Sequence, residues 1–315
     1  MSKPLDGVGR IGLGCATFGR EIDEASAWTV MDAALERGVT LFDTAEAYGG
    51  GQARTYRRDR LGIDDTREVS HEDHSSECVL GRWLKERGCR GRIMLCTKVT
   101  RGFTRQHVRE ALDASLRRLG TDFVDVFYYH QFDPGSEPEE AAAALDEAVS
   151  SGKARFAGLS NYTAAQMAGM PCHVVQPIYN LVKREVERDL LPYCRQHGIG
   201  VVTYSPLGAG FLTGKYTPDR TALPAGTRFH VMPGHADVYF TETNFAAVAG
   251  LARLAERTGV PQSRLALAWV LSNPDVGCML VGARHTGHLD QALEASRLAL
   301  PAELKTELDA LAPVK

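Results

Sequence analysis

Short apolar runs alternate with amphipathic helical patterns along nearly the whole chain. The apolar runs lack the alternating polarity of a half-exposed antiparallel sheet, and continuous apolar strands are typical of a parallel sheet covered by helices on both faces. Eight β/α units in 315 residues favour a closed barrel over an open sheet. We therefore expect one (β/α)8 TIM barrel domain over residues 1–315, with strands at 11–18, 40–43, 92–97, 123–129, 154–159, 173–175, 200–204 and 277–281.

Helices are expected after the strands, many of them followed by a glycine that can adopt a left-handed C-terminal cap. Thr104 is the expected N-terminal cap of one helix, and Pro138 fits the first turn of another. Two connections are unusually long, at about 50–75 after the second strand and about 208–239 after the seventh. The expected helices cover 24–37, 76–87, 104–119, 139–150, 163–168, 187–197, 244–258, 262–272, 288–298 and 302–311.

The composition narrows the classes of partner. A net charge of −3 favours neither nucleic acid nor an acidic membrane surface, and no apolar run approaches the roughly 20 residues that span a bilayer. The N-terminus lacks the apolar core of a signal peptide. The seven cysteines are scattered and form no C-x-x-C pair, which indicates a reducing compartment. We expect a cytoplasmic protein, a monomer or homo-oligomer, that acts on a small molecule.

Charged residues close three neighbouring strands. Asp43, Lys98 and His130 each follow an apolar run, and in a β/α barrel the carboxyl ends of the strands form the active face. Taken singly, each has an ordinary structural explanation: a helix cap, a surface charge and a rim histidine. Because their strands are neighbours, we expect the three side chains to point into one mouth.

Tyr48 follows Asp43 in a glycine-flanked loop, and this group suits carbonyl reduction. A carbonyl that accepts hydride develops alkoxide charge and needs a proton donor. We expect the Lys98 ammonium to lower the pKa of Tyr48, which is ordinarily about 10, and Asp43 to keep Lys98 charged and oriented. His130 can donate to the carbonyl oxygen and align it.

Other chemistries have weaker support. No H-E-x-x-H, zinc-type Cys/His spacing or G-x-S-x-G occurs, so we expect no metal site and no acyl transfer. The glycines at 12, 14 and 19 do not form G-x-G-x-x-G, and those at 208, 210 and 214 do not form a Walker loop. A Schiff-base aldolase that uses Lys98 stays open as an alternative.

These motifs together resemble the aldo-keto reductase family, over nearly the full chain and in order. The pattern is closest to the bacterial members related to potassium-channel β subunits. The residues that carry the resemblance are Phe42-Asp-Thr-Ala-Glu-Ala-Tyr-Gly49, Leu95-Cys-Thr-Lys98, Tyr128-Tyr-His-Gln-Phe-Asp133, Gly158-Leu-Ser-Asn161, Val175-Gln-Pro-Ile-Tyr-Asn180, Tyr204-Ser-Pro-Leu-Gly208 with Gly210, Leu212 and Gly214-Lys-Tyr216, and Ala266-Leu-Ala-Trp269.

The resemblance implies hydride transfer from NADPH, with NADH as the lesser alternative, to an aldehyde or ketone. It implies a catalytic tetrad of Asp43, Tyr48, Lys98 and His130, with Tyr48 as the general acid. It is also compatible with a nicotinamide-binding regulatory or redox-sensing subunit that turns over little substrate. The implied cofactor contacts are Ser160, Asn161, Gln176, Tyr204 (stacked on the nicotinamide), Ser205, Leu207, Gly210, Lys215, Gly282, Arg284, His288 and Gln291.

The chain departs from the family pattern at two places. About twenty residues are inserted within 50–75, either as a solvated surface excursion or as a lid, an anionic-substrate contact or an oligomer contact. Where the pattern has an asparagine that contacts adenine, this chain has Ala292. Arg284 can still pair with a 2′-phosphate, and Arg228 is a weaker candidate for the same face.

Overall fold

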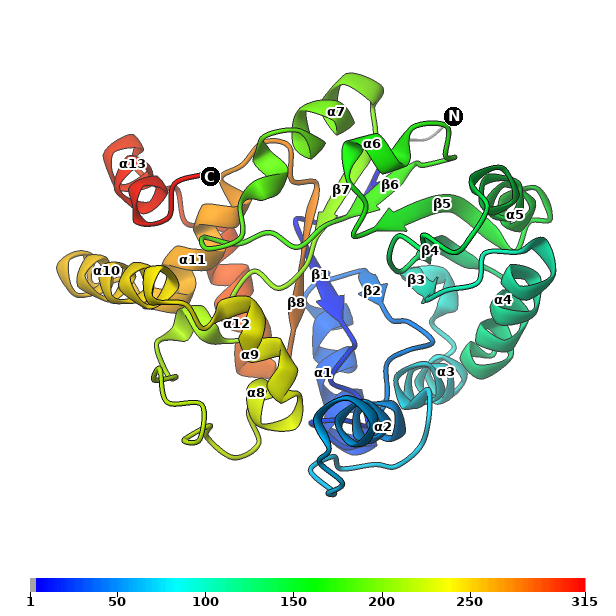
Figure 1. Ribbon diagram of the computed structural model, residues 1–315, viewed down its shortest axis with the longest axis horizontal. Coiled ribbons are helices and arrows are strands. Elements are labelled where there is room, and N and C mark those ends of the chain that lie inside the picture. The colour runs from blue at the N-terminus through cyan, green and yellow to red at the C-terminus, as the bar shows by residue number, and fades with distance from the viewer. Residues whose placement is uncertain (1–3, 315) are drawn as a thin grey trace.

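Eight parallel strands close into a barrel in the order of the sequence, and helices surround it (Figure 1). The computed structural model describes residues 4–314. The predicted TIM barrel is thus confirmed. Its strands are β1 Ile11–Gly14, β2 Leu41–Asp43, β3 Met94–Val99, β4 Val124–Tyr129, β5 Ala154–Ser160, β6 Val174–Gln176, β7 Gly200–Thr203 and β8 Cys278–Gly282.

The covering helices follow the predicted order. The Thr104 side chain accepts a hydrogen bond from the His107 backbone N–H, and Gly120 ends the same helix with φ of 65°, as the capping rules require. The helices are α1 Glu24–Glu36, α3 Ser75–Arg87, α4 Arg105–Leu119, α5 Pro138–Ser150, α6 Ala164–Met167, α7 Leu190–His197, α10 Glu242–Thr258, α11 Gln262–Leu271, α12 Thr286–Ser296 and α13 Ala302–Leu311. Among the described helices, none has the length and apolar character needed to cross a bilayer.

Several predicted boundaries differ from the structure by one to four residues, and three of them have a clear cause or consequence. The first strand stops at Gly14 rather than at Phe18, because the following residues turn and the Phe18 N–H bonds back to the Cys15 carbonyl. The third strand continues to Val99, so Lys98 lies inside it rather than after it. The helix predicted from 187 begins at Leu190, after a short 3-10 turn at Glu185–Glu187.

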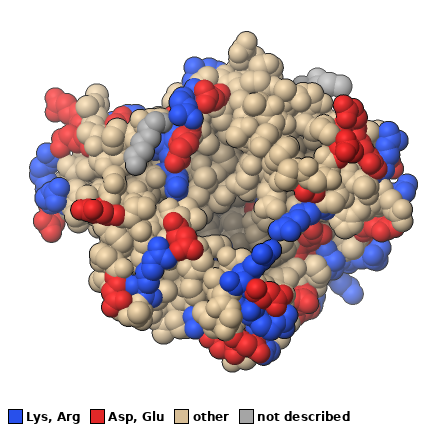
Figure 2. All heavy atoms as spheres, in the orientation of Figure 1, with Lys and Arg blue, Asp and Glu red and all other residues tan. Residues whose placement is uncertain are grey.

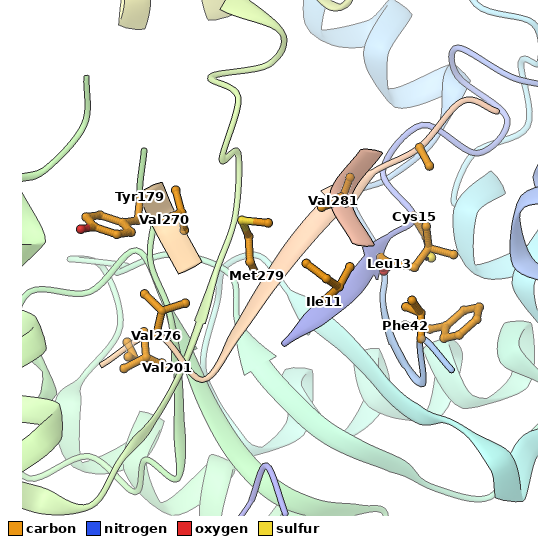
Figure 3. Close-up of a cluster of buried hydrophobic side chains, with 14 of the residues drawn as sticks. Ile11, Leu13, Cys15, Phe42, Tyr179, Val201, Val270, Val276, Met279 and Val281 are labelled. Carbon is orange, nitrogen blue, oxygen red and sulfur yellow. Dashed lines mark hydrogen bonds between the residues drawn. The ribbon is translucent and has the colours of Figure 1, made fainter. Parts of the chain in front are cut away.

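The apolar core has two layers because successive side chains of a strand point to opposite faces. The inner layer fills the barrel, where the missing Cβ of Gly158 makes room for the Tyr128 ring: a Cβ there would lie 2.3 Å from it. The outer layer packs between the strands and the helices, and Figure 3 shows the part of it around β1 and β8. The inner layer consists of Leu41, Cys96, Val126, Tyr128, Val174, Val202, Cys278 and Leu280.

The two long connections contain helices. The one after β2 forms α2, Gly50–Leu61, and the one after β7 forms α8, Arg228–Val231, and α9, Ala236–Tyr239. The helices lie near one another on one face of the molecule (Figure 1). Ala53 of α2 packs against Val231 and Met232 in a small apolar cluster.

Hydrogen bonds from two arginines join the same two connections. Arg57 is 0% exposed, and its Nη1 donates to Glu68 Oε1 at 2.9 Å and to the Val231 carbonyl at 3.0 Å. Arg67 adds a bond from Nη1 to the His230 carbonyl at 2.6 Å. The segment 50–75 is therefore anchored to the connection after β7, although many of its side chains, such as those of Arg58 and Asp59, remain exposed.

Candidate active site

Polar side chains continue the inner layer of the barrel at its carboxyl end. Since inward positions recur at every second residue, each of them lies two residues beyond an apolar member of that layer. The pairs are Leu41 and Asp43, Cys96 and Lys98, Tyr128 and His130, Val174 and Gln176, and Val202 and Tyr204. Strand geometry thus gathers five polar groups at one end of the barrel. Figure 2 shows a hollow near the middle of the face that carries α2, α8 and α9.

A buried ion pair lies at the base of this site. Lys98 Nζ is 2.6 Å from Asp43 Oδ2 and also donates to the Thr44 carbonyl at 2.7 Å. Gln176 Nε2 donates to the other carboxylate oxygen, Asp43 Oδ1, at 2.8 Å. Burial is the largest single effect and opposes the charge on Lys98, but the Asp43 carboxylate and the Tyr48 hydroxyl together outweigh it, and the pKa of Lys98 is raised. A charged amine is no nucleophile, which disfavours the Schiff-base alternative.

Tyr48 lies next to this ammonium. Lys98 Nζ is 3.4 Å from the Tyr48 hydroxyl and 4.8 Å from the centre of its ring. The expectation of a lowered Tyr48 pKa is wrong for this structure: burial raises the pKa and outweighs the opposing effect of Lys98. The hydroxyl is therefore protonated at neutral pH, with a cation beside it that can stabilise the phenolate.

The His130 ring meets the Tyr48 ring edge to face, with 5.4 Å between their centres. Burial, together with the nearby Lys98 charge, lowers the pKa of His130 to about 3, so its imidazole is neutral. Its buried Nδ1 has no hydrogen-bond partner among residues 4–314. Tyr48 and His130 thus offer two polar groups to a ligand in the mouth.

Three further predicted residues form a chain of hydrogen bonds beside the His130 backbone. Asn161 Nδ2 donates to the His130 carbonyl at 2.9 Å, and the Tyr204 hydroxyl donates to Asn161 Oδ1 at 2.8 Å. Ser160 Oγ donates to the Gln176 carbonyl at 2.9 Å. Asn161 takes a left-handed backbone conformation, φ 58°, which turns the chain sharply at the end of β5.

The connection after β7 forms tight turns at the predicted cofactor positions. Ser205 has φ of 54°, and its carbonyl accepts from Asn180 Nδ2 at 2.8 Å. The Leu207 carbonyl accepts from the Gly210 N–H at 3.0 Å. A Cβ on Gly210 would lie 2.7 Å from Lys215 Nζ, so glycine lets the lysine cross this turn.

Lys215, Arg284 and His288 form a group of basic side chains next to these turns. Burial and the Arg284 charge lower the pKa of Lys215, and the pKa of His288 is lowered to about 4 by burial and its basic neighbours. Within residues 4–314, no carboxylate lies within 4 Å of the charged nitrogens of Lys215 or Arg284. Two cations that lie near each other and have no carboxylate within 4 Å make a site for an anion, which fits the phosphates of a nicotinamide dinucleotide.

The remaining predicted contacts lie around this group. Gly282 ends β8 with open space where a Cβ would be, and His288 Nδ1 accepts from the Arg284 N–H at 3.2 Å. Gln291 is exposed on α12. Arg228, also considered for a phosphate, is instead paired with Glu21 at 3.0 Å.

Four of the five arginines of the inserted segment are paired within it, which weakens the case for an anionic-substrate contact there; the fifth, Arg60, is exposed on α2. Carboxylates lie 2.6 to 2.8 Å from the arginine nitrogens, so the positive charges are compensated locally. The pairs are Arg54 with Asp64, Arg57 with Glu68, Arg58 with Asp59 and Arg67 with Asp65.

Two features of the site were missed from the sequence. The bond from Gln176 to Asp43 joins residues 133 positions apart, and no local signal announces it. The second feature is the pair of Arg20 and Glu21 in the loop after β1. A charged pair directly after Gly19 was the available signal.

Comparisons with known proteins agree with this geometry. Residues 10–313 match the model of the aldo/keto reductase family. The "Aldo-keto reductase YhdN" of Bacillus subtilis is 33% identical, over 96% of this chain and 89% of that protein. A "Probable voltage-gated potassium channel subunit beta" of Arabidopsis thaliana is 31% identical, over 89% and 84%. The "Aldo-keto reductase yakc [NADP(+)]" of Schizosaccharomyces pombe is 30% identical, over 94% and 86%.

Proposed function

This chain belongs to the aldo/keto reductase family, and on that premise we propose that it reduces an aldehyde or ketone to an alcohol with NADPH as cofactor and Tyr48 as general acid. Membership of this family supports the assignment of the chain as an oxidoreductase that acts on small carbonyl compounds. The observation that carries the finer proposal is the protonated Tyr48 hydroxyl, 3.4 Å from a lysine held charged by a buried aspartate.

Each polar residue of the mouth has a separate role in proton transfer. Tyr48 donates its proton to the carbonyl oxygen as negative charge develops there. The Lys98 ammonium then stabilises the phenolate, and Asp43 and Gln176 keep that ammonium in place. The neutral His130 ring orients the carbonyl from the other side of Tyr48. When bound, the cofactor supplies the hydride.

The cofactor would lie across the ends of β5 to β8. Ser160 and Asn161 would hold the carboxamide, and the Tyr204 ring would stack on the nicotinamide. Lys215 and Arg284 would pair with phosphate, including the 2′-phosphate that separates NADPH from NADH. The printed name of the fission-yeast relative includes NADP(+), which supports the same choice.

Replacement of Tyr48 by phenylalanine tests the proposal. Loss of a general acid lowers rate by about 10²- to 10⁴-fold, so we expect Tyr48→Phe to lose at least about 100-fold in kcat for NADPH oxidation against a panel of sugars, aldehydes and ketones. NADPH affinity, measured by fluorescence titration, should stay unchanged. Tyr56→Phe on α2 is the control, because that ring is exposed and outside the mouth. Undiminished turnover by Tyr48→Phe would refute the assigned role.

A second candidate is a cofactor-binding regulatory subunit, favoured by the relatives whose printed names are potassium channel β subunits. The two candidates differ in turnover. A purified chain that binds NADPH yet oxidises it with no carbonyl of the panel would support the second candidate.

A further inference from the structure

Arg20 is a buried arginine at the rim of the candidate active site. It lies in the loop between β1 and α1 and is 5% exposed. Its Nε donates to Glu21 Oε2 at 3.0 Å, while its buried Nη2 has no hydrogen-bond partner among residues 4–314. Burying a guanidinium nitrogen without a hydrogen-bond acceptor costs free energy. Such a nitrogen indicates that the protein binds an acceptor that its own chain does not supply.

Other arginines with an unpartnered nitrogen differ from Arg20 in one respect. Arg57 and Arg264 leave only Nε open, and their terminal nitrogens are paired with Glu68 and Glu294. In Arg20 the Glu21 carboxylate accepts from Nε, and the terminal Nη2 has no acceptor. Terminal nitrogens are the ones that grip carboxylate and phosphate groups, so Arg20 retains a donor suited to an anion.

The backbone contacts place this loop beside Tyr48. A Cβ on Gly50, two residues after Tyr48, would lie 2.7 Å from the Gly19 carbonyl, so the two segments touch. Ser75 Oγ donates to the Phe18 carbonyl at 3.1 Å and fixes the loop on its other side. Arg20 is thus held one residue from a contact with the loop that carries the proposed proton donor.

The charges around Arg20 leave an excess of positive charge. Arg20 and Arg228 share one carboxylate, that of Glu21, with nitrogen–oxygen distances of 3.0 Å to each. The Arg20 charge acts on both Tyr48 and His235, opposing the raised pKa of the tyrosine and, with burial, lowering the pKa of the histidine to about 4. The guanidinium therefore lies between the proton donor and the connection after β7, and His235 is neutral at neutral pH, so it does not change the net charge there.

We propose that Arg20 binds the anionic group, a carboxylate or a phosphate, of the carbonyl substrate, and that it determines specificity for charged aldehydes or ketones. This inference rests on the proposed function, since it names the substrate class of that site. Nη2 would donate to an anionic oxygen while the carbonyl oxygen meets Tyr48. The substrate would thereby supply the acceptor that the folded chain lacks.

Two matched pairs of substrates test this with NADPH: succinic semialdehyde against butyraldehyde, and glyceraldehyde 3-phosphate against glyceraldehyde. We expect Arg20→Gln to lower kcat/KM for the charged member by about 10- to 100-fold, chiefly through KM, and for the neutral member by less than about threefold. Arg20→Lys should recover part of the loss. The pair with the larger effect shows whether the natural anion is a carboxylate or a phosphate.

Controls separate this role from a role in folding or in cofactor binding. Because Arg228 still pairs with Glu21 in Arg20→Gln, this variant should keep its fold, and circular dichroism during urea unfolding checks that it does. Arg54 is an exposed arginine of α2, and Arg54→Gln should leave kcat/KM unchanged for both the charged and the neutral substrates. An equal loss for charged and neutral substrates, or a weakened NADPH affinity in Arg20→Gln, would overturn the inference.

A binding measurement can test the anion site at Arg20 separately from the proposed catalytic activity. If the wild-type chain turns over none of the four compounds, calorimetric titration of the NADPH-loaded chain with succinic semialdehyde and glyceraldehyde 3-phosphate decides. Binding that Arg20→Gln abolishes would support the anion site while refuting catalysis. Absence of binding, or binding that the variant retains, would overturn the anion site.

Discussion

Replacing Asp43 with asparagine changes one atom of the buried ion pair and should destabilise the whole barrel. The carboxylate accepts from Lys98 through Oδ2 and from Gln176 through Oδ1, at 2.6 and 2.8 Å. An amide has one oxygen, so in Asp43→Asn one of the two donors faces an NH2 group. Lys98, 0% exposed, also loses its counter-charge and keeps only neutral acceptors, among them the Thr44 carbonyl and the Tyr48 hydroxyl.

The size of the effect follows from this geometry. Removing one partner of a buried pair costs about 3–5 kcal/mol, and we expect about 3 kcal/mol because the Thr44 carbonyl still accepts from Lys98. At about 2.1 cal/mol/K per residue, the unfolding entropy of this 315-residue chain is about 0.66 kcal/mol/K, so the midpoint of thermal unfolding should fall by about 4–5 °C.

Circular dichroism during urea and thermal unfolding would measure the change. Asp43→Asn/Lys98→Met removes the isolated charge while keeping the alkyl stem, and it should recover at least about half of the lost stability. Asp290→Asn, an exposed partner of Arg37, should change the free energy of unfolding by less than about 0.5 kcal/mol. A change below that limit in Asp43→Asn, or a double variant no more stable than the single one, would contradict the reasoning.

Two further predictions concern acid stability and the inserted segment. His130 stays neutral in the folded chain down to about pH 3 but binds a proton below about pH 6.5 when unfolded, so its contribution to stability is lost as pH falls through this window. His130→Gln should therefore flatten the pH dependence of the unfolding free energy between pH 6 and pH 4, by up to about 1.4 kcal/mol per pH unit; an unchanged slope would contradict the buried neutral state. Glu68→Gln leaves the Arg57 guanidinium with only Asp65 as a carboxylate partner, and it should destabilise the attachment of 50–75 by about 3 kcal/mol. Limited proteolysis should then cut this segment faster than in Asp64→Asn, whose ion pair with Arg54 is exposed; equal cutting rates would refute the anchoring role.

The barrel and the positions of its polar residues could be predicted because both follow from local patterns. Continuous apolar strands with intervening helices specify the fold, and polar residues that end such strands must meet at one end of a barrel. The order of the strands alone was enough to predict that Asp43, Lys98 and His130 lie together. The same rules fix the inward layer of side chains.

The missed features depend on contacts between distant segments. The raised pKa of Tyr48 comes from burial, which a loop motif does not disclose. α2 carries charges around most of its surface, including Arg54 and Arg60, so its sequence shows no apolar stripe. It is held by Arg57 and Ala53 against a connection more than a hundred residues away. The burial of Arg20 and its unpartnered nitrogen depend on neighbouring segments, so the sequence alone does not indicate them.

The two-residue step that aligns the polar groups with the inner layer also limits how this chain can vary. A single-residue insertion within β3 would turn Lys98 outward and Thr97 inward, so it would destroy the ion pair and the barrel packing together. The extra segment at 50–75 begins after Tyr48, where strand register no longer matters. Length changes can therefore accumulate in the loops and alter what enters the mouth, while the strands that aim the proton donor tolerate none.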